Sequence, residues 1–548
     1  MELSQIDLDR NINRLRIHAI DFADITNEEL ISLLEKTVEN IQGIAYYWAT
    51  LSAEKKQILQ KHKEGEEWLG GPFVSILTTQ YYIEYLRGNL QIDQDKFDSE
   101  NNSYKVFPNK FIENLTFPLL NAEVRFNKNM SFEQIKEFRG FSQRLGVDNK
   151  VTLVLGAGNV SSIPYLDTLF HLVANRSTIL LKLNPVNDYL LPIFEKVFAE
   201  FIDKGFISVV NGNLDTSKYL TKHRSVDTIH LTGSNFTYEN IVYEKTLTDK
   251  ERGLSTLRKV NKKPIFSELG NVTPIIIHPG KWSISEIKFQ ARKIATAKLN
   301  NSGFNCIAAQ VIVLPKGWES TNKLKKYIKY YLNKIGDTTS YYPGASDSLS
   351  KLQTSNNYEQ VNEDSCLTPF MVADLDSDDI YATTEVWNST LYFKELDYSD
   401  YSSYVENSIN YVNNELWGNL GVSVLFKGNY KSQHKDFIEK YKNELNYGTV
   451  AINEWSAIAF IIPTMPWGGF PGNKDNDIQS GQGYVHNALF FESPLKGIVE
   501  TKFRFSRLID PPWFVNFKIA HKLFKNLTYY QANNSKINFI KLLFSPLI

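Results

Sequence analysis

Two residues capable of covalent and proton-transfer chemistry stand on either side of one predicted helix. Cys306, in NNSGFNCIAAQVIVL, lies in a turn between a helix and a buried strand. A partly exposed cysteine beside backbone N–H groups can have a lowered pKa and act as a nucleophile. Glu268, in PIFSELGN, ends a strand 38 residues earlier, with one helix in between, so both are expected at one edge of a sheet. The alternative is an inert cysteine that fills space in the core.

A glycine-containing turn is the second candidate site. In VLGAGNVSS, Gly156 and Gly158 follow a strand and open a helix, as in dinucleotide-binding turns. The third glycine of that pattern is missing, and the next strand ends at Lys182 instead of an acidic ribose ligand. The turn therefore serves another purpose, or it needs glycine only for its tight geometry.

Several other functions are not expected from this composition. The nine histidines are scattered, so no metal site is predicted. Neither a G-x-S-x-G elbow nor a P-loop is present. Sixty basic residues oppose 61 acidic ones, and the net charge of −1 gives no attraction to nucleic acid. The two cysteines, Cys306 and Cys366, are too few for a disulfide framework and indicate free thiols in a reducing compartment.

The elements that would position these residues alternate in type from Val151 onward. The runs VTLVL, STILLKL, FISVV and TIHL are separated by helix-length segments, which predicts a parallel sheet with crossover helices. A second α/β unit follows, with strands in PIFSELGNVTPIIIH and AAQVIVL around the amphipathic helix SISEIKFQARKIATAKLNNSG.

The N-terminal region is expected to be helical. Apolar residues recur three and four positions apart from Thr26 to about Arg87, and Thr26 and Ser52 are candidate helix caps. The polar, Asn-rich stretch from Asn89 to Asn109 is expected to be an exposed loop or linker.

The sequences at the two ends of the chain provide the evidence on the protein's location in the cell. The first residues are charged and contain no secretory signal, and no run of eighteen apolar residues occurs, so we expect a cytoplasmic protein. Residues 501–548 carry eight lysines and arginines against one aspartate, interleaved with aromatics as in WFVNFKIAHKLFKNLTYY. This tail either makes peripheral contact with an anionic membrane or packs on the body as a helix with a solvated basic face.

Taken in order, these segments resemble the NAD(P)-dependent aldehyde dehydrogenase superfamily. GAGNVSSIP, LLKLNP, HLTGS, SELGN and NSGFNC match its motifs in sequence order, and EVWNST and PWGGFPGN match more loosely. The resemblance implies an α/β fold with a Rossmann-like NAD(P)-binding domain, an α/β catalytic domain and a helical N-terminal region. The expected parts are a helical region at 1–125, the NAD(P)-binding domain at 126–272, the catalytic domain at 273–455, a C-terminal oligomerisation segment at 456–500 and the basic aromatic tail at 501–548.

The resemblance also implies roles for single residues. Cys306 would be the nucleophile, Glu268 the general base and Asn159 the amide that holds the oxyanion. The implied cofactor is NAD or NADP. The residues expected to bind it are Lys182, Gly233, Ser234, Glu385, Gly158 and Leu269.

The implied reaction is oxidation of an aldehyde to a carboxylic acid through a thiohemiacetal and a thioester on Cys306, with hydrolysis by a water that Glu268 deprotonates. The alternative is an acyl-thioester reductase that produces a fatty aldehyde, because G-N-V at Asn159 resembles the fatty acyl-CoA reductase branch of the superfamily. A non-catalytic member that binds nucleotide or membrane is the third hypothesis. The family resemblance also implies a homodimer or homotetramer.

Departures from the family pattern leave parts of this reading open. Asn271 replaces the usual second glycine after Glu268, and Phe304 replaces the usual glutamine before the nucleophile. Pro185 stands where members of the family often have a glutamate that disfavours the ribose 2′-phosphate of NADP, so both NAD and NADP are expected as possible cofactors.

Overall fold

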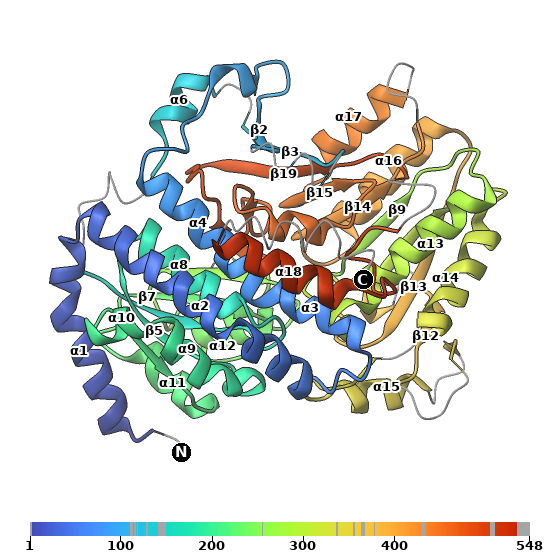
Figure 1. The fold of residues 1–548 in the computed structure, drawn as a ribbon. Helices are drawn as coiled ribbons and strands as arrows, with labels where there is room; N and C mark the ends of the chain where they lie inside the picture. Colours follow the sequence, from blue (N-terminus) through green and yellow to red (C-terminus); the bar gives the residue numbers. More distant parts are fainter. Residues whose placement is uncertain are drawn as a thin grey trace.

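The structure, a computed structural model, is built around two β-sheets with helices on their faces (Figure 1). It describes residues 3–109, 113, 117, 119–127, 130–140, 149–254, 256–335, 338–353, 357–362, 368–376, 379–428, 434–504 and 510–533.

The N-terminal region is helical, as the periodicity predicts. Thr26 caps its longest helix by accepting a hydrogen bond from the Glu29 N–H at 3.2 Å. Ser52, the other predicted cap, lies buried inside this helix because its apolar face continues past that position, so that expectation is wrong. The helices are α1 (Gln5–Ala23), α2 (Asn27–Lys55), α3 (Glu64–Trp68) and α4 (Val74–Leu86).

The polar stretch after α4 is not the plain loop that its composition suggests. It forms β1 (Phe97–Asp98) and β2 (Ser103–Phe107), and β2 pairs with β3 (Asn121–Phe126). Tyr104 and Val106 are buried in the core, which gives this strand an apolar face despite its polar flanks.

The first α/β unit has the strand order β17-β8-β7-β4-β5-β6. Every pair in it is parallel except the short edge strand β17, which runs antiparallel to β8. The four apolar runs that predicted strands are β4 to β7. The strands are β4 (Val151–Leu155), β5 (Thr178–Lys182), β6 (Ile207–Val210), β7 (Thr228–Gly233), β8 (Ile265–Leu269) and β17 (Gly481–Gln482), and the main helices are α8 (Ile163–Ala174), α9 (Leu191–Val197), α10 (Ala199–Asp203), α11 (Leu214–Lys222) and α12 (Asn235–Tyr243).

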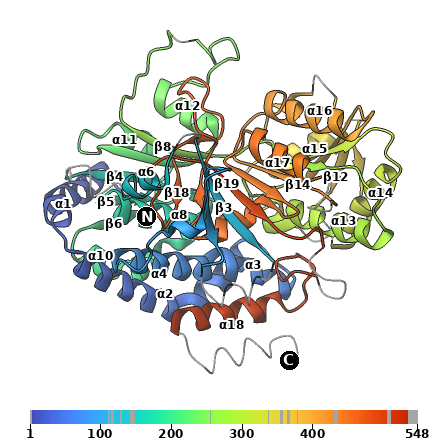
Figure 2. The same ribbon diagram turned by 90° about the horizontal axis from the view of Figure 1, so that it is seen from above.

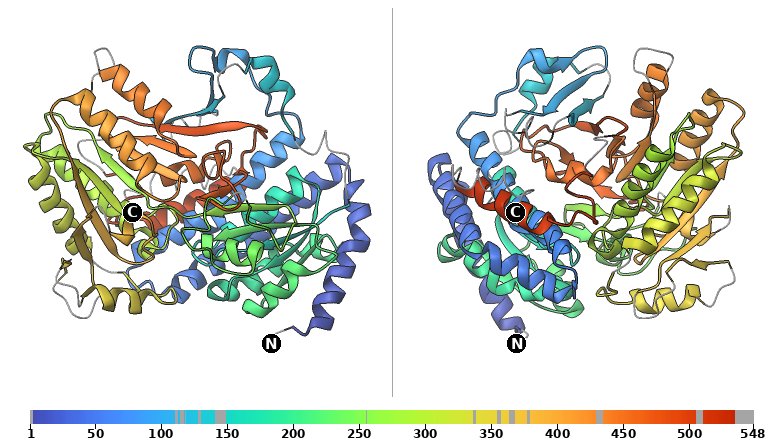
Figure 3. Two further views of the ribbon diagram at one scale, coloured as in Figure 1. Left: turned by 180° about the vertical axis from the view of Figure 1, so that it is seen from behind. Right: turned by 45° about the vertical axis from the view of Figure 1, so that its right-hand side comes forward.

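The second sheet has the order β1-β2-β3-β19-β15-β14-β9-β10-β13-β12-β11, and its centre is parallel. Figure 3 shows the two sheets as separate lobes, with the N-terminal helices against the first. The strands are β9 (Pro274–Ile277), β10 (Val311–Pro315), β11 (Glu359–Gln360), β12 (Met371–Asp374), β13 (Thr390–Leu396), β14 (Gly421–Leu425), β15 (Thr449–Ile452) and β19 (Pro494–Glu500), and the helices are α13 (Ile284–Leu299), α14 (Thr321–Ile335), α15 (Ala345–Gln353), α16 (Tyr401–Asn414) and α17 (His434–Glu444).

The described part of the basic tail contains α18 (Ala520–Asn533), which lies along α2 and α3 (Figure 2). Phe524 and Leu527 are buried against Trp68 and Phe73. This segment therefore packs on the body as a helix, while Lys518 and Lys522 stay exposed and can still face a membrane surface. Within the described ranges, no helix is both long and apolar enough to cross a bilayer.

Candidate active site

A cavity of about 1010 Å³ opens at the carboxyl ends of β4, β5, β7 and β8. Parallel sheets place ligand sites at this edge, because the loops that follow the strands converge there. The structure brings all nine predicted site residues to this cavity. They are Gly158, Asn159, Lys182, Gly233, Ser234, Glu268, Leu269, Cys306 and Glu385.

The turn before Cys306 has an unusual backbone. Asn301, Ser302 and Gly303 all have positive φ, at 51°, 57° and 87°. Position 303 requires glycine for two reasons: its φ lies in the left-handed region, and a Cβ would lie 3.2 Å from the Lys298 carbonyl oxygen. Strained conformations of this kind persist only where the surroundings hold them.

Hydrogen bonds of Asn301 stabilise this turn. Its Nδ2 donates to the carbonyl oxygens of Asn159 and Phe304, at 3.1 and 3.0 Å. Its Oδ1 accepts from Lys56 Nζ at 3.0 Å, and its backbone N–H donates to Glu66 Oε2 at 2.7 Å. The N-terminal helices therefore support the turn that presents Cys306.

Cys306 is half-buried at the cavity wall. Burial, together with the carboxylates of Glu268 and Glu385, raises the pKa of its thiol well above the usual value. The sequence-based expectation of a lowered pKa differs from this result, because burial and, after it, the two carboxyl groups outweigh the effect of the backbone N–H group. With its pKa raised, the thiol of Cys306 needs a base to become a nucleophile.

Glu268 ends β8 and is buried. Its Oε1 accepts a hydrogen bond from Trp467 Nε1 at 2.5 Å, and its Oε2 has no partner among the described residues. Burial and the charge of Asp167 raise the pKa of Glu268 well above 4.5, and the bond from Trp467 opposes that shift. An upward shift is what a carboxylate needs to take and release a proton near neutral pH.

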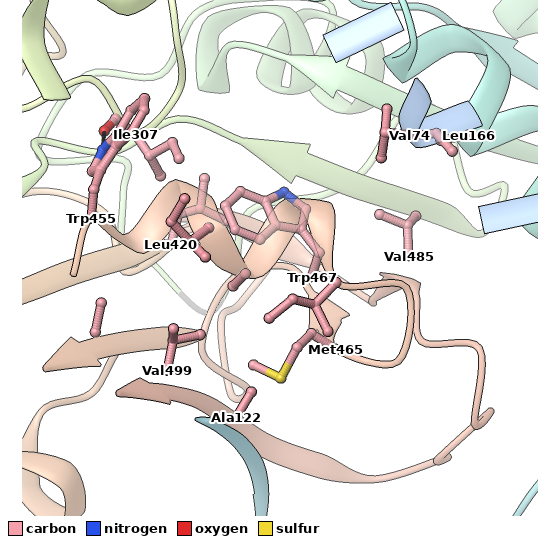
Figure 4. Close-up of a cluster of buried hydrophobic side chains, with 14 of the residues drawn as sticks. Val74, Ala122, Leu166, Ile307, Leu420, Trp455, Met465, Trp467, Val485 and Val499 are labelled. Atoms are coloured by element: carbon pink, nitrogen blue, oxygen red, sulfur yellow. Dashed lines mark hydrogen bonds between the residues drawn. The ribbon is translucent and has the colours of Figure 1, made fainter. Parts of the chain in front are cut away.

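Trp467, on β16 (Pro466–Trp467), was not predicted as a site residue. Figure 4 shows its ring packed in the core among Leu420, Met465 and Val485, so the indole is held in place while its N–H reaches Glu268. The available signal was the PWGG segment, which matches the family only loosely.

Asn159 lies in the loop between β4 and α8. Its Nδ2 donates to the Phe304 carbonyl oxygen at 3.0 Å, two residues before Cys306. A side-chain amide has two N–H donors, so one is left for an oxygen of a bound molecule.

The cavity extends from this centre between α11 and α12, whose residues line it. Gly233 ends β7, and Ser234 caps α12 by accepting from the Thr237 N–H at 3.2 Å. The first N–H groups of α12 therefore face the cavity, an arrangement that favours an anion such as a phosphate.

Glu385 lies on the opposite wall. A Cβ at Gly270 would overlap its carboxylate oxygens, so only glycine lets the carboxylate rest on the turn after β8. Burial raises the pKa of Glu385 to about 8, although Lys298 lowers it. Its Oε1 and Trp387 Nε1 are buried without hydrogen-bond partners in the described part of the chain, and both residues line the cavity. Such orphaned groups fit a ligand that carries hydroxyl groups.

Comparisons with known proteins agree with this arrangement. The sequence model of the aldehyde dehydrogenase family matches residues 159–365. "Aldehyde dehydrogenase family 3 member A2" of Macaca fascicularis is 25% identical over 197 residues, which cover 35% of this chain and 36% of that protein. The aligned segment thus spans about a third of the curated relative.

Solved structures are similar over most of the chain. Betaine aldehyde dehydrogenase from Staphylococcus aureus, in complex with NAD⁺, has a TM-score of 0.61 at 14% identity and covers 92% of this chain and 89% of its own. NADP-dependent glyceraldehyde-3-phosphate dehydrogenase from Bacillus halodurans, complexed with NADP, has a TM-score of 0.58 at 17% identity, with coverages of 91% and 92%. The fold is therefore that of the aldehyde dehydrogenases, with the expected two α/β units and helical N-terminal region. In sequence, the similarity to the aldehyde dehydrogenase family extends over residues 159–365.

Proposed function

We propose that this protein oxidises a small-molecule aldehyde to a carboxylic acid with NAD or NADP. The observation that carries the proposal is that Cys306, Glu268 and Asn159 meet in one cavity that continues into a groove between two helices. The partly matching family model and the NAD⁺ and NADP complexes of structural relatives support it.

The residues on the cavity wall fit a dinucleotide. The N-terminus of α12, with Gly233 and Ser234, suits the pyrophosphate, and Lys182 at the end of β5 suits the adenosine ribose. Glu385, with its orphaned Oε1, would hold the nicotinamide ribose. Gly158 and Leu269 would line the path of the cofactor. When bound, the nicotinamide supplies the hydride acceptor.

The protein's own residues would carry the remaining steps. Glu268 takes the proton of the Cys306 thiol, and the sulfur attacks the carbonyl carbon. The free N–H of Asn159 and the backbone N–H of Cys306 stabilise the oxyanion. After hydride loss, Glu268 releases the thiol proton to solvent and then deprotonates the water that attacks the thioester. The carboxylic acid leaves, and the Cys306 sulfur takes the proton back from Glu268.

The test measures reduction of NAD and NADP in the presence of decanal, and oxidation of NADH and NADPH in the presence of decanoyl-CoA. Aldehyde-dependent reduction that is lost in Cys306→Ala and kept in Cys366→Ala supports the proposal. Activity only with the thioester would assign the protein to the reductase alternative, and inactivity in both arms over a broad aldehyde panel would leave the non-catalytic hypothesis.

We also propose the finer properties that the sequence suggests. These are the five-part division at 125, 272, 455 and 500, a homodimer or homotetramer, a cytoplasmic location, and contact of the 501–548 tail with membranes. Sedimentation equilibrium and binding to anionic vesicles would test the assembly and the membrane contact.

A further inference from the structure

A buried polar network lies behind Glu268, in the interior of the first α/β unit. Asp167 and His171 stand one turn apart on α8, and His230 and Thr232 share one face of β7. Thr232 Oγ1 donates to Asp167 Oδ2 at 2.7 Å, and His230 Nε2 lies 3.2 Å from the same oxygen. Asp167, His171 and His230 are at most 1% exposed, so these three side chains are shielded from water, while Thr232 is half-buried and lines the cavity.

The hydrogen bonds in the network run in one direction. Asn175 Nδ2 can only donate, so His171 Nδ1, 2.7 Å away, accepts. His171 Nε2 then carries a hydrogen for His230 Nδ1 at 3.0 Å, and His230 Nε2 carries one for Thr232 Oγ1 at 3.1 Å. Both imidazoles are neutral in this pattern, in line with the burial that lowers the pKa of His171 well below its usual value. The last donor of this chain, the Thr232 hydroxyl, donates to Asp167 Oδ2, and a carboxylate accepts such a bond more strongly than a neutral group does.

Register places this carboxylate beside Glu268. Thr232 on β7 is the parallel partner of Glu268 on β8, so their side chains project from the same face of the sheet. Thr232 contacts Asp167 directly. The charge of Asp167 is, after burial, the main cause of the raised pKa of Glu268.

The other groups that face this pair add no compensating charge. Tyr82 from α4 is neutral, because burial raises the pKa of its hydroxyl well above 10. His486 from β18 (Val485–His486) is buried, which lowers the pKa of its ring to about 4. Cys306 and Trp467, which face Glu268, supply a neutral thiol and an indole N–H. Two buried carboxylates with no cation facing them cannot both ionise easily.

We propose that Asp167 is a positioning residue for Glu268. Bonded to Thr232, the cross-strand partner of Glu268, it disfavours ionisation of Glu268 and sets the pH above which Glu268 accepts a proton. The role rests on the proposed function, in which Glu268 is the base.

The test is infrared titration of the carboxylic acid C=O band of Glu268, which is identified as the band lost in Glu268→Gln. We expect the band in wild type at neutral pH, and a midpoint lower by about one pH unit or more in Asp167→Asn. Thr232→Val removes the hydroxyl that donates to Asp167 at 2.7 Å. Without this donor Asp167 takes up a proton more readily, so the midpoint of the Glu268 band should also fall. This variant decides the question if Asp167→Asn does not fold. Asp227→Asn, which alters a carboxylate at the far end of β4, is the matched control and should leave the midpoint unchanged.

An unchanged midpoint in folded Asp167→Asn, or no Glu268 band in wild type at neutral pH, would overturn the proposal. The readout needs no substrate, so a shifted band in a protein that oxidises no aldehyde would refute only the proposed function. If the proposed function and the role of Asp167 are both correct, the acidic limb of the pH profile for aldehyde oxidation shifts in Asp167→Asn by the same amount as the midpoint of the Glu268 band.

Discussion

At the scale of single residues, the site is a set of carboxylates and a thiol whose protonation states depend on one another. Glu268 and Glu385 both raise the pKa of Cys306, and Asp167 raises that of Glu268. Burial is the largest cause of both shifts, so the thiol of Cys306 and the carboxyl group of Glu268 give up their protons at a higher pH than they would in water. Activity should rise with pH as Glu268 loses its proton and becomes a base.

Glu268→Gln tests this dependence. Glutamine keeps an oxygen for the Trp467 N–H but cannot take a proton, so thioester hydrolysis should slow by about a hundredfold. At a pH high enough for the Cys306 thiol to ionise without Glu268, quenched-flow mass spectrometry should show an acyl group accumulating on Cys306, and the acidic limb of the pH profile should disappear. Full turnover with the limb retained would show that another group is the base.

Lys298→Met tests a buried charge near the site. Burial lowers the pKa of Lys298 to about 7, although Glu385 opposes this, and its Nζ has no hydrogen-bond partner among the described residues. Because the folded-state pKa is depressed, wild type loses stability as pH falls from about 10.5 toward 7. Methionine removes that cost, so denaturant titration should show a gain of about 2 kcal/mol below pH 7 and none above about pH 10.5. An equal gain at all pH values would contradict this explanation.

At the scale of elements, the site depends on the close approach of segments from both sheets. The turn after β8 brings Gly270 against Glu385, which follows a loop of the second α/β unit. The turn after α13 brings Cys306 to the same cavity. These contacts join the two lobes at the edge where the strands end.

Gly270→Ala tests the first contact. The new Cβ would overlap the Glu385 carboxylate, whose flexible side chain can move aside at little cost to folding. We expect cofactor binding, followed by the fluorescence of NADH or NADPH, to weaken about tenfold while Tm changes little. The control is Gly43→Ala on α2, where a new Cβ meets open space and should leave cofactor binding intact. Gly317→Ala would be a poor control, because that glycine has positive φ.

At the scale of the whole molecule, parts distant in sequence support the catalytic turn. Lys56 and Glu66, from the N-terminal helices, bond to Asn301 just before Cys306. Helix α18 packs on those same helices from the other end of the chain. The termini thus stabilise the layer on which the nucleophile turn rests.

Leu527→Ala tests the role of α18. Leu527 is buried with Trp68 and Phe73, so truncation should destabilise the protein by about 3 kcal/mol, seen as a lower Tm. Lys522→Ala, on the same helix, should change Tm much less. If Leu527→Ala leaves Tm unchanged, α18 is not packed on the body in solution.

Local patterns were sufficient for much of this protein. The β-branched runs predicted β4 to β7, because strand propensity and burial act over a few residues, and the motif segments placed nine residues that now share one cavity. Local patterns failed at Ser103–Phe107, where pairing with β3 overrides a polar composition, and at Ser52, where a long helix continues.

The sequence by itself determined the resemblance to the aldehyde dehydrogenases, the two α/β units and the chemical types at the site, since these depend on short motifs and their order. Only the tertiary structure decided that the Cys306 thiol is neutral, that Trp467 holds Glu268, and that Asp167 lies beside it. Trp467 and Asp167 are 199 and 101 positions from Glu268 in the chain. Burial and charge act through space, so their effect on a pKa is fixed only when folding brings such residues together.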